Sequence, residues 1–454
     1  MKVSRPVGAL AAVSALAMLL AGCGGGGGNA QKSGASDANA FDKNAKTEIT
    51  MGGWSLKMTP EFQKLVDGFE AEYPNVTIKL KEYSADDYDK QLTADISAGA
   101  QPDVFPLKNT VKYNTYAKSQ GLADISDIAK KFADHKNFDD SMYKTKDGKY
   151  YALPYRADHW VLFYNKDMFK KAGVKTPDAT WTWNDYTKAG EELKKKLPDA
   201  GYDANTVYPM YQHNWQSVVQ SFALAQAGQP AEKTYLKGQF GYMKPFYERA
   251  LKWQNEKLTI DYNTSFTNKV QYQAQFGTQK AAMMPMGTWY AASFLSQQKT
   301  GDAQKFDWGM APIPQNPSKK VPSTPVTFGS PTGLMVSAKA SGQKLAAAKK
   351  FVEWSVGEGG ADVLAKLTTT PAYINDKITK DFFAADGMAT DQESKDAWSK
   401  FDMKLEAPVS DATDTVQTLL KTMNSSILTG TSKTDAAINQ CQEDVKNQGV
   451  LSSE

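Results

Sequence analysis

Polar and aromatic side chains crowd one short part of the chain, directly before an apolar run at Val161–Phe163. The crowded residues are Tyr155, Arg156, Asp158, His159 and Trp160. Two charges and a tryptophan beside a buried strand are more than packing requires. Side chains of these types can donate to, accept from and stack against a polar ligand. The alternative interpretation is a solvated loop with one core tryptophan.

Tryptophans recur at predicted strand ends or in loops, each with polar neighbours. They are Trp54 beside Ser55, Trp160 beside Asp158 and His159, Trp215 beside His213 and Asn214, and Trp289 beside Tyr290. A sugar ring has an apolar CH face and a rim of hydroxyls, so aromatic rings receive the face while polar groups satisfy the rim. Gly287, at a strand-to-helix turn, would let a ligand approach the backbone. The pattern predicts a carbohydrate cleft, although each aromatic alone is more often a core residue.

Motifs for other chemistry are missing from the sequence. It holds no phosphate-binding Gly-x-x-x-x-Gly-Lys loop, no Gly-x-Ser-x-Gly nucleophile elbow and no His-Glu-x-x-His zinc motif. Only three histidines are present, at 135, 159 and 213. We therefore expect no metal site, no cofactor and no catalysis. The formal charge of +3 over 454 residues gives no nucleic-acid signal.

The first part of the chain alternates between strand and helix patterns. Strands are predicted at Thr47–Gly53, Val76–Tyr83 and Asp103–Leu107, with helices at Pro60–Tyr73 and Tyr88–Gly99 between them. This order is typical of a parallel α/β sheet, in which ligands sit beyond the carboxyl ends of the strands. Two such ends carry Trp54-Ser55 and Lys108-Asn109.

The rest of the chain continues the mixed pattern. Asn165 is a predicted cap for a helix ending at Gly173, and a proline-rich crossing segment spans Phe306–Gly333. Further strands are predicted at Ala281–Met286, Trp308–Pro312 and Leu334–Val336, and further helices at Thr180–Leu197, Ser217–Ala227, Pro245–Trp253, Gln343–Val356 and Ala361–Leu367, with helices to the end.

The N-terminus has the pattern of a bacterial lipoprotein signal. Lys2 and Arg5 precede the apolar run Gly8–Leu20, which is too short to span a membrane, and the run ends at Leu-Ala-Gly-Cys23. We predict that residues 1–22 are removed and that Cys23 is acylated, for example with palmitate, followed by a flexible linker to residue 46. Cys441 is then the single thiol, so no intrachain disulfide is expected.

Several motifs resemble the family 1 extracellular solute-binding proteins of ABC sugar transporters. They are the lipoprotein motif at Cys23, SAGAQPDVF (Ser97–Phe105), YALPY to LFYNKDMFKKAGV (Tyr151–Val174), TWTWNDY (Thr180–Tyr186) and FGTQKAAMMPMGTW (Phe276–Trp289). The similarity covers nearly all of the mature chain. It implies an α/β, two-lobed periplasmic-binding-protein-like fold of class II, each lobe a sheet flanked by helices. The implied lobes are 47–155 with 309–369, and 156–308 with 370–454. Crossings are expected near Pro154-Tyr155, Met310–Pro314 and Thr369–Tyr373.

The resemblance also implies roles for individual residues. Asp158 falls where members often place a carboxylate that accepts from sugar hydroxyls, and Trp289 where they place a stacking ring. Lys108 and Asn109 match a first-lobe loop that reaches the cleft. The aspartate-arginine pair of the maltose binder is replaced by Thr110-Val111-Lys112, which speaks against maltose.

The sequence therefore predicts a non-enzymatic, monomeric receptor on the outer face of the cytoplasmic membrane that delivers an oligosaccharide to an ABC permease. A polyamine, glycerol phosphate or iron binder, a lipid-anchored glycosidase or lyase, and an adhesion lipoprotein remain open as alternatives. The predicted ligand-binding residues are Trp54, Ser55, Lys108, Asn109, Tyr155, Arg156, Asp158, His159, His213, Asn214, Trp215, Gly287, Trp289, Tyr290, Ser330 and Tyr373.

Overall fold

The computed structural model describes residues 40–57, 60–85, 87–135 and 138–451. The predicted signal peptide, the acylated Cys23 and the linker up to residue 39 lie outside the described residues. These features stay predictions from sequence.

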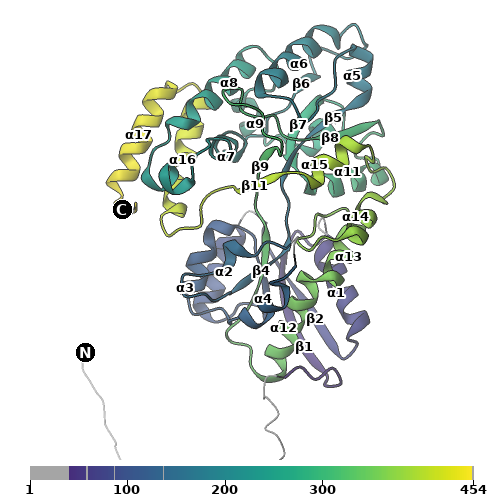
Figure 1. Cartoon of the computed structure of the whole chain (residues 1–454), viewed down its shortest axis with the longest axis vertical. Coiled ribbons are helices and arrows are strands. Elements are labelled where there is room, and N and C mark those ends of the chain that lie inside the picture. The colour runs from purple at the N-terminus through teal and green to yellow at the C-terminus, as the bar shows by residue number, and fades with distance from the viewer. Residues whose placement is uncertain (1–39, 58–59, 86, 136–137, 452–454) are drawn as a thin grey trace, which may run out of the picture. The chain divides into compact units, whose positions relative to one another are not determined.

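The first lobe is built on a five-stranded sheet in the order β2-β1-β3-β10-β4. As predicted, β1 (Thr47–Trp54), β2 (Val76–Tyr83) and β3 (Val104–Leu107) run parallel. A late strand, β10 (Thr332–Val336), inserts antiparallel between β3 and β4 (Ala152–Arg156). The green elements of Figure 1 accordingly lie among the purple and blue ones. This lobe is therefore completed by residues far along the chain.

Helices cover this sheet with their apolar stripes. In α1 (Glu61–Glu72), Phe62, Leu65 and Phe69 recur at helical spacing and are fully buried. The helix α12 (Gly342–Val356) packs on β1, and α13 (Glu358–Lys366) packs on α1. The helices of this lobe are α1, α2 (Tyr88–Ala98), α3 (Tyr113–Lys118), α4 (Ser126–Phe132), α12 (Gly342–Val356) and α13 (Glu358–Lys366).

The second lobe holds a four-stranded sheet in the order β6-β7-β5-β8. Its strands are β6 (Tyr208–Met210), β7 (Ala281–Gly287), β5 (Trp160–Asn165) and β8 (Trp308–Ala311). The Asn165 side chain accepts a hydrogen bond from the Met168 amide (2.9 Å), and Gly173 ends α5 (Lys166–Ala172) with φ 58°. Both ends of α5 confirm the sequence prediction.

Many helices surround the second sheet, and one begins later than predicted. Thr182 and Asp185 form a capping box, so α6 starts at Trp183 and not at Thr180. None of the helices in the described ranges is both long and apolar enough to cross a membrane. The helices are α6 (Trp183–Lys196), α7 (Ser217–Ala225), α8 (Lys244–Asn255), α9 (Tyr262–Thr267), α10 (Gln273–Phe276), α11 (Trp289–Thr300), α14 (Asp376–Phe383), α15 (Gln392–Ser399), α16 (Thr413–Leu428) and α17 (Thr434–Asn447).

The second crossing lies later than Met310–Pro314, where the sequence predicted it. β8 pairs with β5, and β9 (Val326–Gly329) pairs with β11 (Asp402–Leu405), while Phe328 is buried in the second core. The chain therefore returns to the first sheet only at residues 330–331. The prediction is wrong because β8 pairs with a strand that is distant in the sequence. The residues of β8 alone do not indicate which of the two sheets it joins.

Three crossing segments lie side by side and are joined by backbone hydrogen bonds. The Ala157 amide donates to the Thr370 carbonyl (3.1 Å), and the Ala372 amide donates to the Tyr155 carbonyl (3.0 Å). An isolated bridge joins His159 to Gly329. Segments 155–159, 329–332 and 370–372 thus form the connection between the two sheets.

Candidate functional site

Four aromatic side chains from separate segments lie in contact with one another. Trp160 begins β5, Trp289 begins α11, Trp215 precedes α7 and Tyr272 precedes α10. The Trp289 ring lies 5.7 Å from Trp160 and 6.4 Å from Trp215, and Tyr272 lies 5.8 Å from Trp215. We call these four residues the aromatic cluster. Trp160 is buried but Trp215 is 41% exposed, so the cluster presents aromatic surface to solvent on its Trp215 side.

Gly287 allows the Trp289 ring to lie against the backbone. A methyl group at Gly287 would come within 1.9 Å of the Trp289 ring. The sequence suggested that this glycine leaves room for a ligand, but the ring of Trp289 fills that space. Trp289 is half-buried, and its indole nitrogen donates to the Tyr272 hydroxyl at 3.3 Å. Gly287 therefore sets the position of Trp289.

His213 and Asn214 hold the loop that carries Trp215. The His213 ring is buried, its Nδ1 lies 2.8 Å from the Tyr211 hydroxyl, and its ring packs edge-on against Trp215 at 4.4 Å. Burial lowers the pKa of His213 to about 4, so it is neutral at physiological pH. Asn214 donates to the backbone carbonyl and the hydroxyl of Ser265. These two predicted site residues thus fix the loop that positions Trp215 in the cluster.

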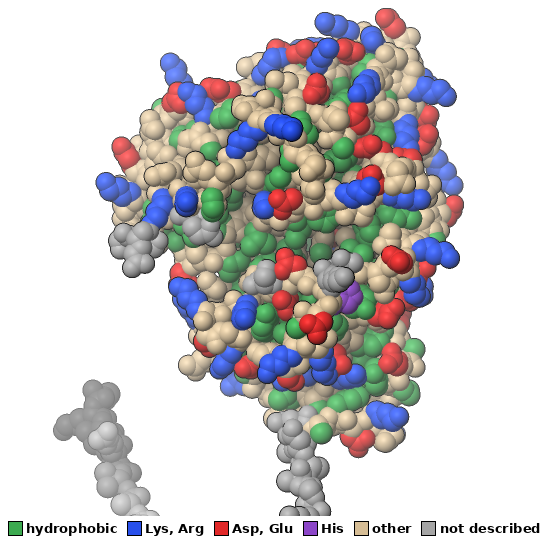
Figure 2. Space-filling model, in the orientation of Figure 1, with side chains coloured by type: hydrophobic (Ala, Val, Ile, Leu, Met, Phe, Trp, Pro, Cys, Tyr) green, Lys and Arg blue, Asp and Glu red, His purple; other side chains and the backbone are tan. Residues whose placement is uncertain are grey.

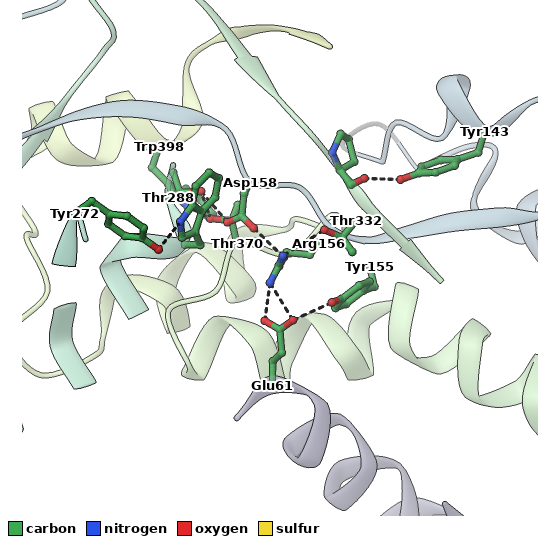
Figure 3. Close-up of polar contacts among 12 residues, drawn as sticks. Glu61, Tyr143, Tyr155, Arg156, Asp158, Tyr272, Thr288, Thr332, Thr370 and Trp398 are labelled. Atoms are coloured by element: carbon green, nitrogen blue, oxygen red, sulfur yellow. Dashed lines mark hydrogen bonds and ion pairs between the residues drawn. The ribbon is translucent and has the colours of Figure 1, made fainter. Parts of the chain in front are cut away.

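A chain of polar side chains, which we call the crossing network, joins the two lobes through the crossing segments (Figure 3). Arg156 donates through one terminal nitrogen to both oxygens of Glu61, at 2.9 and 2.8 Å, and its Nε lies 2.8 Å from Asp158 as an ion pair. Asp158 accepts from the Thr288 hydroxyl (3.0 Å), which in turn accepts from Thr370 (2.9 Å). The network runs from α1 to the residue directly before Trp289.

Asp158 and Arg156, both predicted to bind the ligand, therefore have partners inside the protein. The side chains of Glu61 and Asp158 are only 4% and 3% exposed, and that of Arg156 is 15% exposed. One cation serves two buried carboxylates, and removal of either partner of a buried pair leaves the other charge uncompensated. We treat both predicted contacts as structural partners of the crossing and not as ligand contacts.

Replacing Asp158 with asparagine should flatten the pH dependence of stability. Burial, opposed by Arg156, raises the pKa of Asp158 from 3.8 to about 6. Because the folded-state pKa lies above the unfolded value, the contribution of this group is complete below about pH 4 and is lost as pH rises through about 6. Wild type should therefore lose on the order of 2 kcal/mol relative to Asp158→Asn across this window. Urea unfolding from pH 4 to 7 checks this, and parallel profiles would contradict it.

The predicted first-lobe residues gather at the carboxyl ends of β1 and β3. Trp54 is buried between Phe62 and Tyr88, and the Lys108 ammonium lies 5.2 Å from the Trp54 ring centre. Lys108 also donates to the Ala85 carbonyl. Ser55, with φ 48°, turns the chain out of β1, and Asn109 is exposed. Lys108, Ser55 and Asn109 remain candidates for ligand contact, whereas Trp54 is a packing residue.

The other predicted site residues have partners inside the protein. His159 is fully buried, stacks on Phe401 at 3.7 Å and contacts the Ala397 carbonyl, and Tyr290 is fully buried against Phe163. Both rings therefore point into the interior of the protein. The remaining contacts are Tyr155 hydroxyl to Glu61 (2.8 Å), Ser330 hydroxyl to Glu406 (3.1 Å) and the Tyr373 ring to His135 (3.9 Å).

Sequence reasoning missed Tyr272 and Glu406. Tyr272 belongs to the aromatic cluster, but it lies directly before α10 and not at a strand end, so the pattern used for the tryptophans does not include it. Glu406 follows β11 and lies beside the second crossing, where burial raises the pKa of its carboxyl while the hydroxyls of Ser330 and Ser217 oppose this. No group of three or more potential metal-binding side chains occurs among the residues the structure describes.

Two α/β lobes joined by three adjacent crossings, with an exposed aromatic surface beside them, define a two-lobed binding protein of the periplasmic type. The chain belongs to the bacterial extracellular solute-binding protein family, whose family model matches residues 55–362. The members of this family are binding proteins located outside the cytoplasm.

Individual relatives agree with this assignment. A putative binding protein of Brucella abortus (strain 2308) is 29% identical over 290 residues, which is 63% of this chain and 66%, just under two thirds, of that protein. The melibiose/raffinose/stachyose-binding protein of Bacillus subtilis (strain 168) is 25% identical, covering 82% of each chain. A sugar transporter structure from Rhizobium etli, in an open conformation, matches with a TM-score of 0.75 and 27% identity over 88% of this chain and 99% of that one.

Proposed function

We propose that this protein captures an oligosaccharide on the aromatic cluster and delivers it to an ABC permease, tethered to the membrane through acylated Cys23. The observation that carries the proposal is the partly exposed Trp215 beside Trp289 and Tyr272. Flat aromatic surface suits the CH face of a sugar ring, and neighbouring polar groups suit its hydroxyls. The sugar ligand named for the Bacillus relative supports this class of solute.

The charge distribution supports a neutral ligand. Figure 2 shows Lys and Arg side chains mixed with Asp and Glu over the visible face, without a large area of one sign. The residues of the aromatic cluster carry no charge, and the nearby Glu406 accepts hydrogen bonds from serine hydroxyls. A polyamine or a glycerol phosphate would call for several charges of one sign around the ligand.

A thermal-shift screen of the purified protein, lacking residues 1–22, against mono- to tetrasaccharides tests the proposal. A ligand at 100 times its Kd should raise the free energy of unfolding by about 2.7 kcal/mol. The intensity of tryptophan fluorescence should change over the same sugar concentrations, because three of the four residues of the aromatic cluster are tryptophans. The screen also includes putrescine and glycerol 3-phosphate, and stabilisation by either of these alone would overturn the proposal.

Two additional measurements separate capture from the remaining alternatives. Incubation with the stabilising sugar followed by chromatography should return the sugar intact, whereas cleavage products would indicate a glycosidase or lyase. Small-angle scattering should show a more compact particle with saturating sugar, because binding between lobes favours a closed state. Identical scattering profiles would contradict closure on the ligand.

A further inference from the structure

Two large hydrophobic side chains are exposed in the described part of the chain, and both lie near the same loop. Trp215 is 41% exposed and Phe266 is 55% exposed. A single exposed aromatic residue is ordinary on a protein surface. These two, however, directly follow residues that are hydrogen-bonded to each other. Asn214 donates to both the carbonyl and the hydroxyl of Ser265, at 3.3 Å each.

The segment that carries Phe266 borders the aromatic cluster at further points. The Tyr211 hydroxyl donates to the Val270 carbonyl at 3.2 Å. The Tyr272 ring, at the end of the same segment, packs against His213 at 5.3 Å and against Trp215 at 5.8 Å. Residues 265–272 therefore run along the loop 211–215, and Phe266 lies in this segment directly after the residue that binds Asn214.

One face of the Phe266 ring rests on a tyrosine ring, and the side chain is otherwise largely exposed. It stacks on Tyr262 with a centroid distance of 5.6 Å and an interplanar angle of 15°. Tyr262 is buried, and its hydroxyl lies 3.0 Å from that of Ser425. Asp261 caps the helix that carries both rings by accepting from the Thr264 amide (2.9 Å). Phe266 is thus a pre-positioned flat apolar surface, and pre-positioning lowers the entropic cost of binding.

We propose that Phe266 is an outer subsite that receives a second sugar ring of an oligosaccharide whose first ring lies on the aromatic cluster. The proposal rests on the proposed function and extends it to the length of the ligand, which must contain at least two rings. The solvent-exposed, flat Phe266 ring suits stacking against the apolar CH face of a sugar ring. Asn263 and Asn268 lie close to Phe266 in the sequence and carry amide groups of the kind that bind hydroxyls.

Calorimetric titration with sugars of increasing length tests this subsite. The probes are glucose, maltose, maltotriose and maltotetraose, and galactose, melibiose, raffinose and stachyose. Phe266→Ala should weaken binding of the longer sugars about fivefold to tenfold and leave the shortest bound sugar within about twofold of wild type. Phe266→Tyr should restore the affinity for the longer sugars. Trp215→Ala should weaken every sugar that binds.

A matched variant separates loss of the flat aromatic ring from loss of stability. Phe266→Leu retains apolar contact with Tyr262 but lacks a flat face, so it should melt like wild type and still lose affinity for the longer sugars. If Phe266→Ala and Phe266→Leu bind all lengths as wild type does while Trp215→Ala weakens them, the outer subsite is wrong and the proposed function stands. If wild type binds none of these sugars, the proposed function fails and the subsite fails with it.

Discussion

Replacing Arg156 with methionine is expected to lower the free energy of unfolding by about 3–5 kcal/mol at neutral pH. Arg156 is the cation of the crossing network, in contact with Glu61 and Asp158, which are 4% and 3% exposed. Methionine retains much of the apolar stem but leaves both buried carboxylates without a counter-charge. Urea unfolding followed by circular dichroism measures the loss.

Acid and a matched control separate the charge effect from simple loss of packing. At about pH 4, below the raised pKa of about 6 of Asp158, this carboxyl takes up a proton, so the cost of Arg156→Met should shrink. Arg249 serves as the control, because its guanidinium packs over the Phe246 ring at 4.4 Å and its buried Nε has no hydrogen-bond partner among the described residues. Arg249→Met should show no comparable dependence on pH. If Arg156→Met is as stable as wild type at pH 7, the crossing network does not contribute to the stability of the fold.

Much of the fold could be predicted because its elements carry local signals. The alternation of Val76, Ile78 and Leu80 marks β2, and the spacing of Phe62, Leu65 and Phe69 marks α1. The resemblance also implies that residues 309–369 belong to the first lobe, and β10 does lie in the first sheet. The pairing of β8 with β5 depends on contacts between distant residues, which no local pattern encodes. For this reason the second crossing was predicted about twenty residues too early.

Only part of the site could be predicted, because some of its contacts also join residues that are distant in the sequence. Tryptophans at strand ends drew attention to Trp160, Trp215 and Trp289, which the structure brings together with Tyr272. The partner of Arg156 could not be identified, because Glu61 lies 95 residues away in the sequence. The resemblance implies that Asp158 accepts from sugar hydroxyls, whereas its carboxylate is buried between Arg156 and Thr288.

Substituting alanine for Gly287 should reduce sugar affinity nearly as much as removing the Trp289 ring itself. The added methyl group would lie 1.9 Å from the present position of that ring, so the indole must move away from Trp160 and out of the cluster. Overpacking of this kind also costs about 1–3 kcal/mol of stability. Loss of one stacking ring should weaken sugar binding by roughly 0.5–1.5 kcal/mol. Calorimetry and urea unfolding measure the two effects on the same samples.

A double-mutant cycle decides whether Gly287 acts through Trp289. In Trp289→Ala, the space beside Gly287 is empty, so adding Gly287→Ala should change neither affinity nor stability further. Strong non-additivity in both quantities is therefore expected. Additive losses would mean that Gly287 approaches the ligand directly, as the sequence alone suggested. A Trp289→Ala protein with wild-type affinity but a stability loss of about 3–5 kcal/mol would instead make Trp289 a core residue and restrict the sugar-binding surface to Trp215 and Tyr272.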